Sequence, residues 1–187
     1  MAKVKWIFIA LTLAVALSAQ ADSNCYTADA ESGELKFSGQ AEGNFFQGHF
    51  REFSVRLCLR NEDLQTAEIE VEVATGSVTV GNRQGDQALH DDELFAAERY
   101  PRAQWVSGVI EQQAQGYLAA GELTLRSVSA SQPVMLKLEM NGDSWALSGE
   151  AVIPRLAFDV GQGEFADPDF ISPDIRLEFH LNLEPEL

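Results

Sequence analysis

Basic residues are scarce in this sequence of 187 residues. Thirteen Lys and Arg stand against 29 Asp and Glu, which leaves a formal net charge of −16 at pH 7. A surface of this charge repels the phosphate backbone of nucleic acids and the anionic faces of membranes. The composition therefore argues against a nucleic-acid partner and is typical of a soluble, exposed acidic surface.

Cysteine and histidine are rarer still. The two cysteines, Cys25 and Cys58, form no C-x-x-C motif, and the three histidines, His49, His90 and His180, are isolated from one another. These spacings do not match the common zinc sites, so no metal is expected. Two readings of the cysteines stay open, a disulfide in an exported protein or two buried free thiols. We expect the disulfide, because an even pair in an exported chain favours it.

Catalytic motifs are also missing. The chain contains no G-x-S-x-G elbow, no P-loop and no H-E-x-x-H motif. If the protein were an enzyme acting on a lipid or quinone head group, Asp86, Glu93 or His90 would be the candidate base. No nucleophile with an orienting partner accompanies them. We therefore expect no enzymatic activity and no required cofactor.

Only one long apolar run occurs, Trp6–Leu17, and it lies close to the N-terminus. Two lysines precede it, and the small-x-small sequence Ala19–Ala21 follows, which is the pattern of a cleavable signal peptide. The run is shorter than the ~20 residues of a membrane span, which disfavours an uncleaved anchor. We predict a signal peptide over residues 1–21, a single domain over residues 22–187, and a periplasmic location.

Long helical patterns are absent from the rest of the chain, where apolar and polar residues alternate. Ile69, Val71 and Val73 alternate with glutamates, and this period of two is the signature of strands with one apolar face. Consecutive antiparallel strands must protect their edges, and closure into a single β-barrel does so, with a two-sheet sandwich as the alternative. We predict about eight strands, near residues 34–42, 45–60, 66–80, 102–112, 116–126, 133–141, 144–154 and 174–184.

One stretch, Asp91–Pro101, interrupts the alternation. It begins with acidic residues, which favour the first turn of a helix, and it ends at a proline, which stops one. We predict one short helix near residues 86–99. Leu94 and Phe95 lie on this stretch, and Trp105 follows on the next strand.

Short motifs recur along the whole mature chain. They are Asp29–Phe37, Gly48–Phe50 with Phe53, Asp86–Leu89, Leu94–Phe95, Glu98–Pro101 with Trp105, Gly121–Leu125 with Val128 and Pro133–Val134, and Ala151–Phe158. Together, and in this order, they resemble the YceI-like family. Four positions depart from the family pattern, because Glu31 and Ala88 replace histidines, Gly85 replaces an arginine and Ser127 replaces a glycine.

The resemblance implies an all-β, lipocalin-like antiparallel barrel that encloses a polyisoprenoid chain. It also implies a periplasmic protein that binds isoprenoid lipids or quinones without acting on them. Burial of such a chain is favourable by ~0.8 kcal/mol for each CH₂ group removed from water. The residues that we expect to line the cavity are Phe37, Phe50, Val71, Val73, Leu94, Phe95, Tyr100, Trp105, Leu123, Leu125, Leu136, Leu138, Trp145, Phe158, Leu177 and Phe179.

A filled barrel is the rival hypothesis. The same aromatic and aliphatic residues would then form a solid core, and the acidic exterior would bind a protein partner of the cell envelope. Periodicity does not distinguish the two, because a barrel of about eight strands is just wide enough to be filled or to hold one slender ligand. The absence of the family's arginine and histidine at Gly85 and Ala88 is compatible with a neutral ligand such as a quinone.

Overall fold

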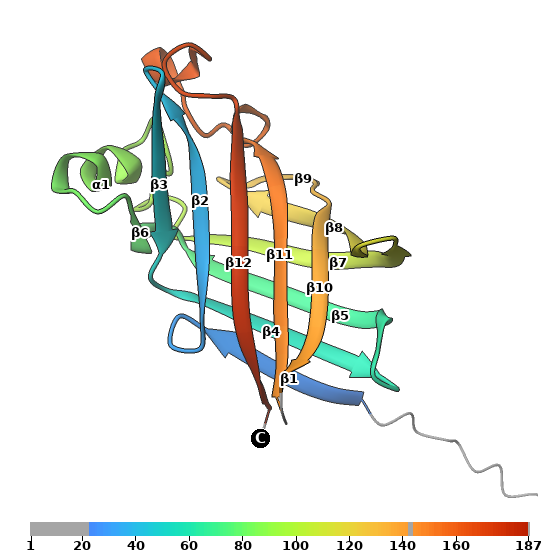
Figure 1. The fold of residues 1–187 in the computed structure, drawn as a ribbon. Helices are drawn as coiled ribbons and strands as arrows, with labels where there is room; N and C mark the ends of the chain where they lie inside the picture. The colour runs from blue at the N-terminus through green and yellow to red at the C-terminus, as the bar shows by residue number, and fades with distance from the viewer. Residues whose placement is uncertain (1–22, 142–143, 187) are drawn as a thin grey trace, which may run out of the picture.

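The computed structural model describes residues 23–141 and 144–186. The predicted signal peptide over residues 1–21 lies outside the described residues. Strands make up most of the described chain (Figure 1). They are β1 (Ser23–Asp29), β2 (Gly33–Ala41), β3 (Asn44–Phe50), β4 (Phe53–Arg60), β5 (Asp63–Ala74), β6 (Val78–Thr79), β7 (Arg102–Gln113), β8 (Gly116–Leu125), β9 (Val128–Ser131), β10 (Val134–Asn141), β11 (Ser144–Pro154) and β12 (Asp174–Pro185).

Eight of these strands close into an antiparallel barrel. They pair in the order β1, β4, β5, β7, β8, β10, β11 and β12, and β1 pairs with β12 to complete the ring. The closing ladder is short, since it consists of Tyr26 opposite Pro185 and Thr27 opposite Glu184. The predicted single barrel is therefore confirmed, and the sandwich alternative is not.

The remaining strands extend the barrel at one end. β2 pairs with β12, β3 pairs with β2, and β6 pairs with the last residues of β3, while β9 pairs with β8. In Figure 1, β10, β11 and β12 cross in front of β4, β5 and β7, and β2 and β3 continue the front layer to the left of β12. The long strand β12 thus runs from the extended end of the barrel to the β1–β12 junction.

Two of the predicted strands are divided in the structure. The predicted strand 45–60 is β3 and β4, separated by a bend at Arg51–Glu52, and the predicted strand 66–80 is β5, the 3-10 turn η1 (Thr75–Ser77) and β6. β1 and β9 were outside the predicted set. The sequence does carry a signal at both breaks, because the charged pair Arg51–Glu52 and the polar stretch Thr75–Ser77 interrupt the apolar alternation.

The prediction of a helix near residues 86–99 is wrong in its position. The helix α1 spans Arg83–His90, because the Asn82 side chain accepts a hydrogen bond from the N–H of Gly85 and caps it there. The segment 91–101 is a series of turns, with Ala96 in the left-handed region at φ 47°. The Arg126 guanidinium donates to the carbonyls of Asp92 and Leu94 in this segment and ties the turns to the end of β8.

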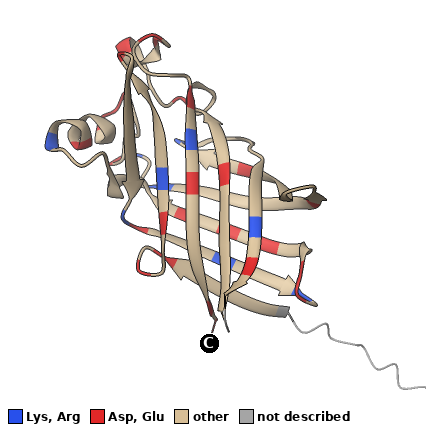
Figure 2. Cartoon of the chain, viewed as in Figure 1, with Lys and Arg blue, Asp and Glu red and all other residues tan. Residues whose placement is uncertain are grey.

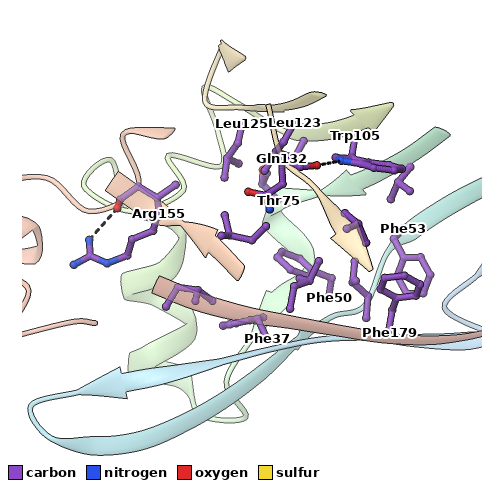
Figure 3. Close-up of a pocket in the computed structure, with 18 of the residues that line it drawn as sticks. Phe37, Phe50, Phe53, Thr75, Trp105, Leu123, Leu125, Gln132, Arg155 and Phe179 are labelled. Atoms are coloured by element: carbon purple, nitrogen blue, oxygen red, sulfur yellow. Dashed lines mark hydrogen bonds between the residues drawn. The ribbon is translucent and has the colours of Figure 1, made fainter. Parts of the chain in front are cut away.

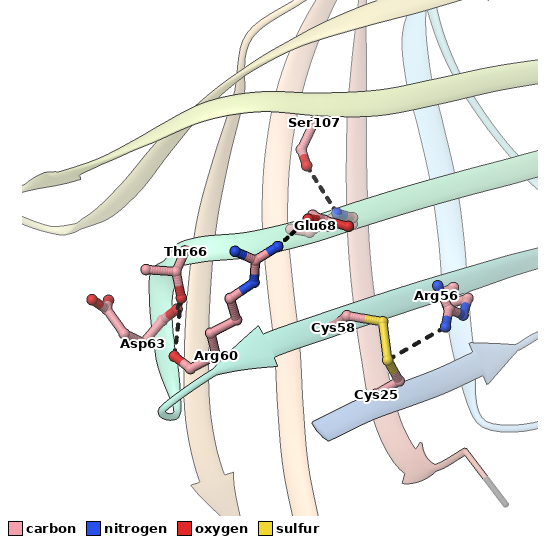
Figure 4. Close-up of polar contacts among 9 residues, drawn as sticks. Cys25, Arg56, Cys58, Arg60, Asp63, Thr66, Glu68 and Ser107 are labelled. Carbon is pink, nitrogen blue, oxygen red and sulfur yellow. Dashed lines mark hydrogen bonds and ion pairs between the residues drawn. A yellow bond between two sulfur atoms is a disulfide. The ribbon is translucent and has the colours of Figure 1, made fainter. Parts of the chain in front are cut away.

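A disulfide fastens the barrel beside its closing ladder. Cys25 on β1 and Cys58 on β4 are directly opposite each other and are joined, with their Cα atoms 4.0 Å apart (Figure 4). Among the described residues no cysteine is free. The N–H of Glu186 donates to the carbonyl of Cys25 at 2.9 Å, and the Glu186 carboxylate accepts from Nε of Arg56 at 3.0 Å. We call this part of the molecule, around the β1–β12 junction, the seam end.

The opposite end of the barrel is covered by irregular segments. We define the loop end as residues 91–101 and 155–172, which include η2 (Arg155–Phe158) and η3 (Gly163–Ala166). Leu94, Leu125, Phe158 and Val160 form a small buried cluster there, separate from the main core inside the strands. The two segments meet where the N–H groups of Gly161 and Gln162 donate to the carbonyl of Glu93.

Figure 2 shows charged residues, mostly acidic, spaced along the strands of the barrel. Glu68, Glu70 and Glu72 of β5 alternate with residues that face the interior, as the period of two predicts.

In the part of the chain that the structure describes, no helix has the length and apolar character needed to cross a membrane.

Candidate functional site

The barrel encloses a cavity of about 220 Å³. A cavity needs only about 10–15 Å³ to hold one water molecule, so this space is far larger than a packing defect. The interior is therefore hollow, and the solid core of the rival hypothesis is not what the structure contains.

The cavity wall is formed by the inward faces of strands from the whole barrel, together with residues of the loop end. All of its residues are apolar except Thr75, Gln132 and Arg155. The wall consists of Leu35, Phe37, Phe46, Phe50, Phe53, Val55, Ile69, Val71, Thr75, Leu89, Leu94, Phe95, Ala103, Trp105, Leu123, Leu125, Gln132, Val134, Leu136, Leu147, Ile153, Arg155, Val160, Ile171, Ile175, Leu177, Phe179 and Leu181.

The two uncharged polar wall residues, Thr75 and Gln132, bond to backbone carbonyls. The Thr75 hydroxyl donates to the carbonyl of Tyr100 at 2.6 Å. The Gln132 amide donates to the carbonyls of Pro133 and Val152, each at 3.0 Å. Because these donors are already paired, the two side chains offer the cavity acceptor oxygens but no free donor.

Arg155, the third, is 3% exposed and bonds to three carbonyls of the loop end. Its Nε donates to Ser172 at 2.9 Å, its Nη1 to Val160 at 3.0 Å and its Nη2 to Ile171 at 2.6 Å. Burial lowers the pKa of the guanidinium, although an arginine remains charged at neutral pH. Figure 3 shows the guanidinium directed away from the aromatic part of the wall, so Arg155 holds the loop end together.

Aromatic rings form a continuous row along one side of the cavity. The ring of Phe37 lies 6.3 Å from that of Phe46 and 5.4 Å from that of Phe50, measured between centroids. Phe50 in turn lies 6.0 Å from Phe95 in an edge-to-face arrangement. The row connects β2 and β3 to the loop end, and Figure 3 shows Phe37 and Phe50 close together with Phe179 and Phe53 nearby. Such a wall contacts an apolar chain through dispersion and specifies no charge.

Most of the residues predicted to line the cavity do lie in its wall. The structure places there Phe37, Phe50, Val71, Leu94, Phe95, Trp105, Leu123, Leu125, Leu136, Leu177 and Phe179. Leu94 and Phe95 face inward as predicted, although they do so from turns rather than from a helix. Contact of these residues with a ligand stays a prediction.

Five predicted residues are outside the wall. Val73 is buried in the main core and Phe158 in the loop-end cluster, while Leu138 and Trp145 are partly buried against the main core. The Tyr100 ring instead faces Arg126, whose Cζ lies 5.7 Å from the ring centroid. A strand is longer than the cavity beside it, so a side chain that points into the barrel can still lie above or below the cavity.

The prediction missed wall residues of two kinds. Leu35 shares the inward phase of Phe37 on β2, and Leu181 shares that of Phe179 on β12, so the period of two could have found them. Val160 and Ile171 lie in the irregular loop end, where no periodicity indicates which side chains face inward.

The three residues considered as a catalytic base do not lie in the cavity wall. Asp86 accepts from the Val80 N–H at 2.7 Å and from the Thr79 hydroxyl at 2.8 Å, and these two donors hold the pKa of the Asp86 carboxyl below its usual value. Asp86 therefore joins β6 to α1. Glu93 is exposed, and His90 ends α1.

Among the described residues, the single group of three candidate metal ligands is Cys25, Cys58 and Glu186. Both sulfur atoms of this group are in the disulfide, so neither is a thiolate that binds a metal ion.

The comparisons with known proteins agree with this architecture. Residues 26–183 match the model of the YceI-like domain. A UPF0312 protein of Photorhabdus laumondii is 24% identical over 100 residues, which cover 54% of this chain and 51% of that protein. The chain thus spans about half the length of the curated relatives that it matches.

Two solved structures share the fold. BcnA of Burkholderia cenocepacia superimposes with a TM-score of 0.78 at 22% identity, covering 83% of this chain and 98% of BcnA. A polyisoprenoid binding domain from Saccharophagus degradans gives a TM-score of 0.67 at 17% identity, covering 86% of this chain and 98% of that domain. At these identities the similarity establishes the barrel architecture alone.

Proposed function

The chain belongs to the YceI-like family, and on that basis we propose that it is a non-enzymatic carrier that binds an isoprenoid-like lipid or a quinone inside its barrel. The observation that carries this proposal is the apolar cavity inside the barrel, in which Thr75 and Gln132 use their donors on backbone carbonyls. An apolar chain gains ~0.8 kcal/mol for each CH₂ group that leaves water for such a wall. The Saccharophagus degradans domain, described as polyisoprenoid binding, supports the same ligand class.

The proposal includes export to the periplasm. The N-terminal pattern of a signal peptide and the two cysteines support it, because disulfides persist in oxidising compartments. In that setting a carrier removes a water-insoluble chain from solution and releases it elsewhere, which requires binding and no chemical step. A protein partner in the envelope, reached through the acidic exterior, is compatible with this role.

Mass spectrometry of an organic extract tests the proposal. The protein would be purified without detergent from the periplasm of a Gram-negative host. We expect an isoprenoid lipid or quinone in stoichiometric amount. An extract without lipid, together with an unchanged melting temperature when prenyl alcohols are added, contradicts the proposal.

A matched pair of variants shows where the lipid is bound. Leu177 lines the cavity, whereas Val152, on the neighbouring strand, is 53% exposed on the outside of the barrel. Leu177→Trp fills part of the cavity, so we expect it to reduce the extracted lipid strongly. Val152→Trp adds the same side chain outside the barrel and is expected to leave the lipid content unchanged. Equal lipid content in the two variants contradicts binding inside the barrel.

A further inference from the structure

The Trp105 indole lies flat across β8 over a glycine. It extends from β7 past Gly121 to Gln132, where its Nε1 donates to the backbone carbonyl at 2.9 Å (Figure 3). The N–H of Gln132 donates to the carbonyl of Gly121 at 2.8 Å, which places the glycine directly beneath this bridge. A Cβ atom at Gly121 would lie 2.3 Å from Cε2 and Cζ2 of the indole and 2.6 Å from its Nε1.

Two other walls of the cavity repeat this arrangement. Phe179 on β12 is paired with Gly149 on β11, and a Cβ at Gly149 would lie 2.5 Å from the phenyl ring. Phe37 on β2 is paired with Gly48 on β3, and a Cβ at Gly48 would lie 2.3 Å from that ring. All three aromatic residues line the cavity. Each ring therefore occupies space that a side chain on the adjacent strand would otherwise take.

We propose that these glycine–aromatic pairs set the width of the cavity and make it selective for a methyl-branched isoprenoid chain over a straight acyl chain. A ring that lies flat against the wall leaves the centre open. A ring raised by a Cβ beneath it would project into the cavity and narrow it. This inference rests on the proposed function and adds the shape of the ligand to it.

The selectivity follows from packing. A methyl-branched chain is broader than a straight one and fills a wide cavity, whereas a straight chain leaves gaps in which wall atoms lose their contacts. Narrowing the cavity excludes the branched chain first. The ratio of the affinities for the two chains therefore measures the width, and a general loss of stability would not change that ratio in a fixed direction.

Gly121→Ala is the most direct test. All three of the closest atoms to a Cβ at this position belong to the Trp105 side chain, whereas Gly48 and Gly149 also approach backbone carbonyls within 2.5 Å. We expect delipidated Gly121→Ala to bind geranylgeraniol about tenfold more weakly than the wild type. This is the loss of affinity expected when roughly two methylene-sized groups of the ligand no longer contact the wall. Affinity for octadecanol should fall less. Isothermal titration calorimetry of both alcohols measures the ratio.

Rescue and control variants accompany the test. Trp105→Leu in the Gly121→Ala protein removes the displaced indole, so we expect it to restore binding of geranylgeraniol. Gly76→Ala is the control, because Gly76 is exposed and a Cβ there meets nothing closer than 3.9 Å. It should bind both alcohols as the wild type does.

If Gly121→Ala does not fold, Gly39→Ala replaces it. A Cβ at Gly39 would lie 2.8 Å from Ile175 and 2.9 Å from Phe46, and both of these residues line the cavity. The same change in the ratio of affinities is expected.

The outcomes separate the two proposals. A wild-type protein that binds neither alcohol contradicts the proposed function itself. If the wild type binds both alcohols and the variant loses affinity for both by the same factor, or for neither, the width inference is overturned while the carrier function stands.

Discussion

At the seam end of the barrel a disulfide and strand pairing join neighbouring segments, whereas at the loop end buried arginines bond to backbone carbonyls. Cys25 and Cys58 link two adjacent strands covalently beside a closing ladder of only two residue pairs. Arg155 and Arg126 donate hydrogen bonds to backbone carbonyls of segments that form no strand ladder. The irregular end of the cavity therefore depends on single side chains.

Removal of the disulfide should have the largest effect. The bond closes a loop with a sequence separation of 33 residues, for which the chain-entropy model gives about 3–4 kcal/mol. We expect Cys25→Ser/Cys58→Ser to lose about this much free energy of unfolding, measured by urea denaturation. Wild-type protein in reductant should show the same loss. A change below about 1 kcal/mol would indicate that strand pairing alone keeps the seam closed.

Arg155→Met should cause the second-largest loss of free energy of unfolding. The substitution leaves the buried carbonyls of Val160, Ile171 and Ser172 without their donor, and an unsatisfied buried polar group costs about 1–3 kcal/mol. We expect a loss of about 3 kcal/mol in urea denaturation, with amide hydrogen exchange rising first in the loop end.

Arg155→Lys is the comparison for this prediction. It keeps the charge but supplies no planar set of donors, so it should recover only part of the loss. Full recovery by lysine would show that charge, rather than the geometry of the three hydrogen bonds, holds the loop end.

The contact of Asp86 with β6 should stabilise the protein less than Arg155 does, and this stabilisation should depend on pH. Hydrogen bonds from Val80 and Thr79 lower the pKa of the Asp86 carboxyl in the folded protein below its ordinary value of 3.8. The unfolded state then binds its proton first as the pH falls, so the stabilisation is present above pH 3.8 and is lost as the pH falls through the lower, folded pKa. Asp86→Asn should reduce the melting temperature at neutral pH, and its difference from the wild type should shrink below pH 3.8. A difference that is independent of pH would assign the effect to something other than the ionised carboxylate.

The smallest effect is expected for an ion pair near the seam end. Arg60 lies 3.0 Å from Glu68, and both side chains are more than half exposed (Figure 4). Exposed pairs of this kind contribute about 0–1 kcal/mol, so Arg60→Ala should change the free energy of unfolding by less than about 0.5 kcal/mol. A larger loss would mean that the seam end is held by charge as well as by the disulfide.

Alternation along the strands predicted most of the barrel and much of the cavity wall. Phe37, Val71 and Leu177 were assigned inward because their neighbours are polar, and the structure places them in the wall. Alternation could not assign Val160 in the irregular loop end. Tyr100 was placed at the cavity from the stretch Asp91–Pro101, and its ring instead contacts Arg126. The same stretch was predicted to be helical, but it forms turns whose carbonyls at Asp92 and Leu94 accept from Arg126.

The amino-acid sequence by itself determined that the chain forms antiparallel strands with one apolar face and an acidic exterior, because a period of two and the distribution of charge are local properties. The tertiary structure decided between the barrel and the sandwich, through the pairing of β1 with β12. Only the tertiary structure decided that the barrel is hollow. Within the barrel, rings such as Trp105 lie over glycines such as Gly121 on neighbouring strands. At the loop end, Arg155 donates hydrogen bonds to the carbonyls of Ser172 and Ile171. Such contacts join residues whose spacing in the sequence carries no signal, so packing in three dimensions alone sets the space that remains.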